Sequence, residues 1–468
     1  MTFFKTSHLR LLVGIFLLAF CVRGGYFALE YRAHNFDIEQ AIHGDDGYYE
    51  LSRGILAGHG LSWDSEPPYR PNPLRTPVYP YAIAGVLWAT GSYWVVLALQ
   101  VLIGSLTPVL SFFLARRLTV SIKIAAAVGV AMALQPYHVL FSTIFYTETL
   151  FIFLFLSFVL LFLRYLDESS LQRLALASGV LGLAILTKPT IQYLPVVVAA
   201  FVLWRYRRAW RTALVQAAVS CGIVLLMLAP WFYRNYAAFG VAGMTAQPAF
   251  NLIVYLAPSV IALEQGSAID QEAFLKERGI DPYNITLATA PAYTAQAVEI
   301  IKQHPRGLAL VVVLSGLTFF THDGMLTVLQ YAGYTPSSYL SAPAVQLALT
   351  APLQLLQELS ARAASPLGLV LLMRVLGYAI TLMFVVGAAL YLWRGPRSAA
   401  GVFGLVLVAY FMCTTPINGL GVNARFRMPV EPIILSVAAL GAVAIFRRLP
   451  HTASAISHEQ TVGRNPVL

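Results

Sequence analysis

"TETLFIFLFLSFVLLFL", residues 147–163, is an apolar run with a single ionisable side chain, Glu148, near its start. The whole chain has this character: of 468 residues, 58% are hydrophobic and 11% are charged, and the mean hydropathy is +0.70. Soluble domains carry about 25% charged residues, so the composition excludes a soluble protein. Long apolar runs also exclude a transmembrane β-barrel, whose strands alternate in polarity. The sequence predicts an all-α, polytopic transmembrane helical bundle.

Apolar segments long enough to be considered as spans recur along the chain. They lie near residues 9–29, 93–115, 124–142, 147–163, 172–187, 189–204, 212–231, 369–393, 399–415 and 428–446. With crossings between 241 and 366, we expect about 10–12 spans. The first segment is interpreted as an uncleaved span because no signal-peptide cleavage site follows it. Residues 79–91 are too short to span and predict an interfacial helix. Residues 307–320 are either re-entrant or pair with 343–357 as two crossings.

Basic residues gather at alternate ends of these segments, as in "RYRRAWR" (205–211). The positive-inside rule then places the amino terminus in the cytoplasm of a multi-pass protein, with a bacterial inner or plasma membrane as its expected location. The net charge of +10 is therefore explained by membrane topology and not by nucleic-acid binding. Residues 1–448 form the membrane domain, with extracytoplasmic regions at 30–78 and about 232–366. The tail, 449–468, is expected to be cytoplasmic and disordered.

The first outer loop contains "GDDGYYELSRGILAGHGL" (44–61), with two adjacent carboxylates, Asp45 and Asp46. Tyr48, Leu51 and Ile55 recur at helical spacing and predict an amphipathic helix on the membrane surface. The carboxylates would then lie at its amino end, where they can cap it. A fixed and partly desolvated carboxylate can act as a general base. The alternative is a pair of solvated loop residues.

Further charged residues fall at the same predicted membrane face. Arg75, in the proline-broken "RTPVYP" (75–80), presents a planar fork of donors suited to phosphate. Glu148 is an ionisable group at the start of a span, which indicates function by default, or else a carboxylate that complements the helix dipole. Lys188, between two spans, is either a functional cation or a snorkelling lysine.

Three outer arginines complete the candidate set: Arg234 in "PWFYRNYAAFG" (230–240), and Arg425 and Arg427 in "RFRMPVEP" (425–432). So many cations at headgroup level favour a lipid-linked phosphate as ligand. His138 and the pair His322–Asp323 are interpreted as packing residues, because no partners at metal-ligand spacing accompany them. The sequence shows no Walker motif or glycine-rich phosphate loop, which argues against a nucleotide-driven enzyme.

Taken in order, these motifs resemble those of GT-C glycosyltransferases. "GDDGYY" is similar to their acidic first-loop motif, and "RTPVYP", "LTKPT" (186–190), "PWFYRN" and "RFRMPVEP" are similar to later elements. The nearest likenesses are protein mannosyltransferase-like and lipid A aminoarabinose transferase-like enzymes. Departures are Asp46 where glutamate is common and the missing glycine in "KPT".

The resemblance implies a donor sugar on a polyprenyl phosphate and transfer to an acceptor hydroxyl with inversion. Asp45 would be the general base, with Asp46 and Glu148 as further catalytic acids. The implied donor-phosphate cations are Arg75, Lys188, Arg234, Arg425 and Arg427, and the implied substrate-pocket residues are Tyr48, Tyr49 and Tyr79.

No cofactor is expected. A divalent ion on Asp45, Asp46 and Glu148 stays open as an alternative. The expected partners are the lipid donor, a glycan, lipid or protein acceptor and membrane lipids, and the protein is expected to be a monomer. A transporter or flippase, which would place its site near the midplane, and a glycan ligase or polymerase using a lipid diphosphate are the alternative functions.

Overall fold

The computed structural model of the protein describes residues 6–38, 46–267, 270–334, 352–363, 365–393, 398–420 and 424–446. Helices make up 81% of the structure, and the described residues contain no strand. This confirms the predicted all-α class. The lipid environment explains this class, because a backbone embedded in lipid must satisfy its polar groups internally, as a helix does.

Seven described helices are long and apolar enough to cross a membrane, or eight if a bent pair counts as one span. Five are α1 (Thr6–Ala33), α5 (Tyr93–Thr119), α8 (Glu148–Glu168), α11 (Trp210–Phe239) and α20 (Leu367–Trp393). The other two reach this length with adjoining turns: α21 (Ala399–Thr414) with η5 (Thr415–Asn418), and α23 (Glu431–Phe446) with α22 (Ala424–Arg427) and η6 (Met428–Val430). Shorter apolar helices include α4 (Val78–Thr90), α6 (Ile122–Leu134), α9 (Leu171–Thr187) and α10 (Leu194–Arg205). The expected 10–12 spans are therefore divided between long helices and shorter apolar ones.

Prolines account for part of this difference. The segment expected at 124–142 is interrupted at Gln135, because Pro136 disfavours the helical conformation in the residue before it and begins the separate helix α7 (Pro136–Leu140). Helices α15 (Ala290–Gln303) and α16 (Pro305–Thr321) are bent by 99° at a proline and form a broken span or a re-entrant loop. The alternative partner of 307–320, at 343–357, lies mostly outside the described residues.

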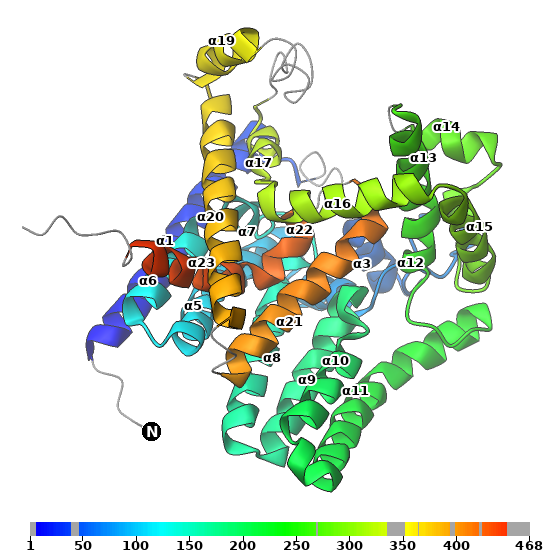
Figure 1. Cartoon of the computed structure of the whole chain (residues 1–468). Coiled ribbons are helices and arrows are strands. Elements are labelled where there is room, and N and C mark those ends of the chain that lie inside the picture. The colour runs from blue at the N-terminus through cyan, green and yellow to red at the C-terminus, as the bar shows by residue number, and fades with distance from the viewer. Residues whose placement is uncertain are drawn as a thin grey trace, which may run out of the picture.

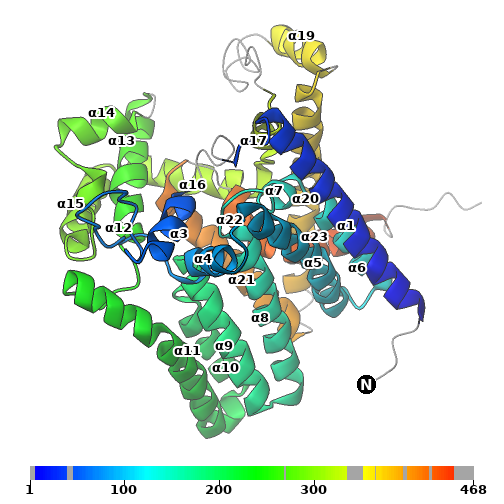
Figure 2. The same ribbon diagram turned by 180° about the vertical axis from the view of Figure 1, so that it is seen from behind.

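Helix α8 forms the centre of the bundle, between α5, α9 and α21. Its buried phenylalanines carry the core: Phe155 packs edge-on against Phe411 at 5.4 Å, and Phe162 lies 4.6 Å from Phe403. Figures 1 and 2 show α9, α10 and α11 side by side, with α1, α5 and α6 across α8 from them. α1 continues to Ala33, so Glu30, expected in the first loop, is instead buried in the bundle.

The remaining helices gather near the carboxyl end of α11 (Figure 1). They are α12 (Gln247–Phe250), the π-helix η3 (Asn251–Leu256), α13 (Ala257–Gln265), α14 (Gln271–Glu277) and α15. α16 connects this group to α20 through α17 (Met325–Tyr331) and α19 (Pro352–Ala363). The interfacial helix predicted at 79–91 is α4, and the amphipathic helix predicted after Asp46 is α3 (Tyr48–Leu56).

The two ends of α8 differ in character. At its carboxyl end, Arg117 pairs with Asp167 and Arg173 pairs with Glu168, so the basic turns after α5 and α8 lie together. At its amino end, Glu148 pairs with Lys188 and Arg425, and Asp46 connects Arg425 to Arg75. With a rise of 1.5 Å per residue, these ends are about 30 Å apart, the thickness of a bilayer core.

Candidate active site

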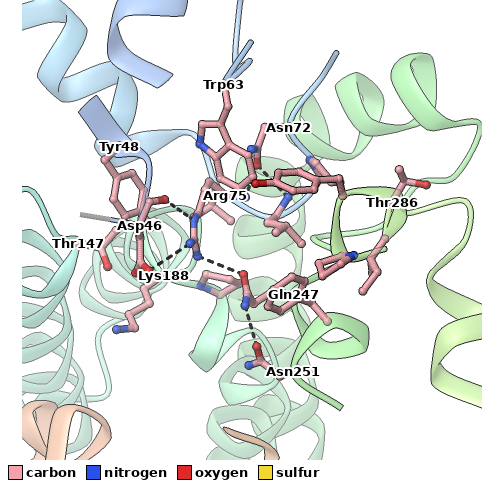
Figure 3. A pocket seen from close by; sticks show the side chains of 18 of the residues that line it. Asp46, Tyr48, Trp63, Asn72, Arg75, Thr147, Lys188, Gln247, Asn251 and Thr286 are labelled. Carbon is pink, nitrogen blue, oxygen red and sulfur yellow. Dashed lines mark hydrogen bonds and ion pairs between the residues drawn. The ribbon is translucent and has the colours of Figure 1, made fainter. Parts of the chain in front are cut away.

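A cavity of about 700 Å³ opens at the amino end of α8 (Figure 3). Its walls come from the turn before α3, the loop 63–76, the α9–α10 junction, α12 with η3, the 282–286 loop, and residues 418, 425 and 426. Its lining combines charged and amide side chains with aromatic ones: Asp46, Asn72, Arg75, Lys188, Gln247, Asn251, Asn418 and Arg425, together with Trp63, Phe250 and Tyr255. This combination suits a ligand with a charged group and an apolar or sugar face.

The turn that presents Asp46 has an unusual backbone. Asp46 has φ 60° and Gly47 has φ 78°, so two successive residues adopt the left-handed conformation. Aspartate tolerates this conformation better than most residues, and glycine adopts it without cost. A side chain at Gly47 would also collide with the Trp63 indole, whose nitrogen donates to the Gly47 carbonyl at 3.1 Å. Gly47 is the N-cap of α3, and no side chain among the described residues forms a capping hydrogen bond at that end.

The capping role expected for the acidic pair is therefore wrong for Asp46, whose carboxylate is instead held between two arginines. Oδ2 accepts from Arg425 Nη2 at 2.9 Å, and Oδ1 lies 3.3 Å from Arg75 Nη2. Burial by itself raises the pKa of this carboxyl, but the Arg425 and Arg75 guanidiniums outweigh it and lower the pKa below its usual value. Asp46 is thus ionised near neutral pH.

Glu148 binds Lys188 and shares Arg425 with Asp46. It begins α8, as predicted, and is only 1% exposed. One of its oxygens, Oε1, accepts from Lys188 Nζ at 2.6 Å and also from Arg425 Nε. Arg425 therefore bridges Glu148 and Asp46 and lies over the Tyr146 ring at 4.6 Å.

Lys188 follows the last residue of α9, where Pro189 begins a short 3₁₀ turn. Burial lowers its pKa to about 8, although the Glu148 carboxylate opposes this shift. The ammonium is thus charged at neutral pH and loses its proton in mildly alkaline solution.

The charges of this cluster do not cancel. Its described members are three cations, Arg75, Lys188 and Arg425, and two carboxylates, Asp46 and Glu148. Three positive and two negative charges leave one positive charge beside the cavity. Such an excess in a partly buried site favours an anionic ligand.

The structure brings together five of the residues that the sequence singled out, together with Tyr48, which lies against Arg75 and Tyr79. Asp45 lies outside the described residues. Tyr79 and Tyr49 are buried behind the cavity: Tyr79 donates to Gln100, and Tyr49 packs on Tyr93.

Arg234 and Arg427 contact other parts of the protein. Arg234 donates to the Asn72 carbonyl at 3.1 Å, stacks on Trp231, and lines a neighbouring hollow of about 600 Å³. Arg427 donates to the carbonyls of Phe319 and Phe320 at the end of α16. The structure thus places neither side chain among the cavity-lining residues.

Of the histidines expected to pack, His138 is buried and lies 3.4 Å from Glu431, and the His322 ring lies 6.5 Å from the Tyr137 ring; Asp323 pairs with Arg374. No group of three or more metal-ligating side chains lies within the described residues. The described carboxylates nearby are already paired: Asp46 and Glu148 each bind two side-chain cations, and Asp64, which lines the cavity, pairs with Arg70.

Sequence reasoning missed the cavity amides Gln247, Asn251 and Asn418. Gln247 and Asn251 are four residues apart and therefore share a helix face, which is a signal that the sequence contained. Nothing in the sequence joins them to Asn418, 167 residues away.

Comparison with known families now adds an independent observation. Residues 72–234 match the family model described as dolichyl-phosphate-mannose-protein mannosyltransferase. This match confirms the resemblance to GT-C membrane glycosyltransferases. It includes Arg75, Glu148 and Lys188, while Asp46 and Arg425 reach the same cavity from outside the matched segment. No match was found among curated proteins.

Proposed function

We propose that this protein transfers a sugar, in one inverting displacement, from a polyprenyl-phosphate donor to an acceptor hydroxyl. The observation that carries the proposal is the convergence of three cations, Arg75, Lys188 and Arg425, beside a cavity at one end of the bundle. The mannosyltransferase family match supports the same reaction.

The reaction has a simple balance. The acceptor oxygen bonds to the anomeric carbon, its proton moves to Asp45, and the bond from that carbon to the phosphate oxygen breaks. Negative charge then grows on the departing polyprenyl phosphate. Arg75, Lys188 and Arg425 are positioned in advance to stabilise it, so little reorganisation is needed during the step.

Asp46 has a different role from its neighbour. As an ionised carboxylate bound by two arginines, it is a weak base and holds Arg75 and Arg425 at the cavity. Glu148 does the same for Lys188 and Arg425. We assign the proton transfer to Asp45 and the positioning of the cations to Asp46 and Glu148.

The membrane orientation belongs to the same proposal. The basic turns at the carboxyl end of α8 face the cytoplasm by the positive-inside rule, so the cavity opens on the extracytoplasmic side. The amino terminus is then cytoplasmic, in a bacterial inner or plasma membrane. We further propose a monomer that needs no metal and acts on a glycan, lipid or protein acceptor.

A donor-release assay tests the function. Purified protein in detergent, without an ion gradient, is given radiolabelled polyprenyl-phosphate mannose, the sugar that the family description names, and then other hexose and pentose donors. We expect release of polyprenyl monophosphate, unchanged by EDTA and abolished in Asp45→Asn. A parallel reaction supplies a polyprenyl-diphosphate-linked glycan; turnover of that donor alone, with release of polyprenyl diphosphate, would instead indicate a ligase or polymerase. Movement of the lipid between leaflets of a vesicle, with the sugar bond intact, would indicate a flippase.

A further inference from the structure

Three amide side chains connect Arg75 to a distant segment of the chain, and Figure 3 shows the first two, Gln247 and Asn251. Arg75 Nη1 donates to Gln247 Oε1 at 3.2 Å, and Gln247 Nε2 donates to Asn251 Oδ1 at 2.7 Å. Asn251 Nδ2 donates to Asn418 Oδ1 at 2.8 Å. Asn418 Nδ2 then donates to the backbone carbonyl of Thr415 at 3.2 Å. We call Gln247, Asn251 and Asn418 the amide relay.

Both ends of the amide relay force its direction. Arg75 can only donate, so Gln247 must turn its oxygen toward the guanidinium and its nitrogen toward Asn251. The Thr415 carbonyl can only accept, so Asn418 must turn its nitrogen toward Thr415 and its oxygen toward Asn251. Rotating any one amide by 180° would place donor against donor or acceptor against acceptor. The three amides therefore have one consistent orientation and lock one another.

The backbone keeps the two halves of the amide relay close. Asn251 begins the π-helix η3. π-Helices are rare in proteins, and those that occur are often found at functional sites. Gly419, next to Asn418, lies directly on this helix. A Cβ at Gly419 would be 2.7 Å from the Tyr255 carbonyl oxygen and 2.5 Å from Ser259 Oγ, and its φ is 64°. Only glycine fits there, so the close approach is built into the fold.

The amide relay acts on the one nitrogen of Arg75 that Asp46 does not hold. Nε donates to the Asp46 backbone carbonyl at 3.0 Å, and Nη2 lies near the Asp46 carboxylate. With Gln247 on Nη1, each nitrogen of the guanidinium has a partner, and its plane is defined. A planar fork binds phosphate well only in a fixed orientation, since its strength is its bidentate geometry.

We propose that Gln247, Asn251 and Asn418 are positioning residues, which orient the Arg75 guanidinium for the donor phosphate. This role rests on the proposed function, because Arg75 has that role there. Gln247 itself lines the cavity, so a direct contact with the sugar is the competing explanation, and the test separates the two.

The test is a double-mutant cycle on donor turnover. We expect Gln247→Leu to lower kcat/KM for the lipid donor about 10- to 100-fold, the loss of a hydrogen bond to a charged group. Asn418→Asp, which offers an acceptor to the Thr415 carbonyl, should give a smaller loss in the same direction. The Arg75→Lys variant lacks the guanidinium fork. In that background, adding Gln247→Leu should lower kcat/KM by less than about threefold relative to Arg75→Lys alone. Gln303→Leu, at an exposed amide of α15, is the matched control.

Two results would overturn the amide relay as a positioning device. Equal losses from Gln247→Leu in the wild-type and Arg75→Lys backgrounds would mean that Gln247 acts independently of Arg75. Wild-type kcat/KM in both relay variants would mean that it does not act on turnover at all. If no lipid-phosphate sugar is turned over even by the wild type, the proposed function fails. Melting temperatures of Arg75→Lys, Asn418→Leu and their double variant then decide the relay: coupled losses support it, and additive losses refute it.

Discussion

Replacing Glu148 by glutamine tests the charge cluster most directly. Glu148 is 1% exposed, and its Oε1 accepts from both Lys188 and Arg425. The amide keeps the shape but removes the negative charge, so the partly buried Lys188 and Arg425 are left with only Asp46, which Arg75 also binds. Removing one partner of a buried ion pair typically costs 3–5 kcal/mol. We therefore expect Glu148→Gln to lower the free energy of unfolding by about 3–5 kcal/mol.

The second half of this prediction is a rescue. Lys188→Met removes one of the two stranded cations, so Glu148→Gln with Lys188→Met should be more stable than the sum of the single losses implies. Groups in contact show coupling energies of about 0.5–3 kcal/mol. Melting in detergent at pH 7 and low salt measures all three variants, with Glu299→Gln on exposed α15 as control. The reasoning would be refuted if Glu148→Gln melted at the same temperature as the wild type. It would also be refuted if the stability losses of Glu148→Gln and Lys188→Met simply added in the double variant.

Three further predictions follow from the same geometry. Asp45→Asn should reduce turnover by about 10²–10⁴ without lowering the melting temperature, whereas Asp46→Asn should lower both; equal melting temperatures for the two variants would contradict the separate roles. Because the folded pKa of Lys188 is about 8, below its unfolded value, turnover should fall as pH rises through about 8. The free energy of unfolding should rise as pH increases above about 8. In Lys188→Arg, a pH–rate profile should show the alkaline fall in turnover displaced to higher pH. Gly47→Ala should destabilise the protein and change Trp63 fluorescence, because its φ is 78° and its Cβ meets the indole; an unchanged melting curve would count against it.

The acid side of the pH profile has the opposite sign. Asp46 has a folded pKa below its unfolded value, because Arg425 and Arg75 favour its charged form over the cost of burial. Its contribution to stability is therefore complete above the unfolded pKa and is lost as pH falls through the folded one.

The sequence by itself determined the fold class and much of the site's composition. Apolar runs in lipid can only become helices, because no other open structure satisfies the backbone there. Glu148 and Lys188 could be chosen from sequence because a charge at the edge of an apolar run is costly and needs a reason. Helix breaks such as the one at Gln135–Pro136 were also encoded locally, although the predicted segment 124–142 ran through it as one span.

Only the tertiary structure decided which charges meet. Arg425 and Arg427 look equivalent in "RFRMPVEP", but residues two apart on a helix point about 200° from each other. One therefore reaches Asp46 and Glu148, while the other reaches the carbonyls that end α16. The amide relay is similar, since Arg75, Gln247 and Asn418 are separated by more than 160 residues at each step. Local pattern carries no information about such contacts, because they arise when helix ends from remote parts of the chain pack at one end of the bundle.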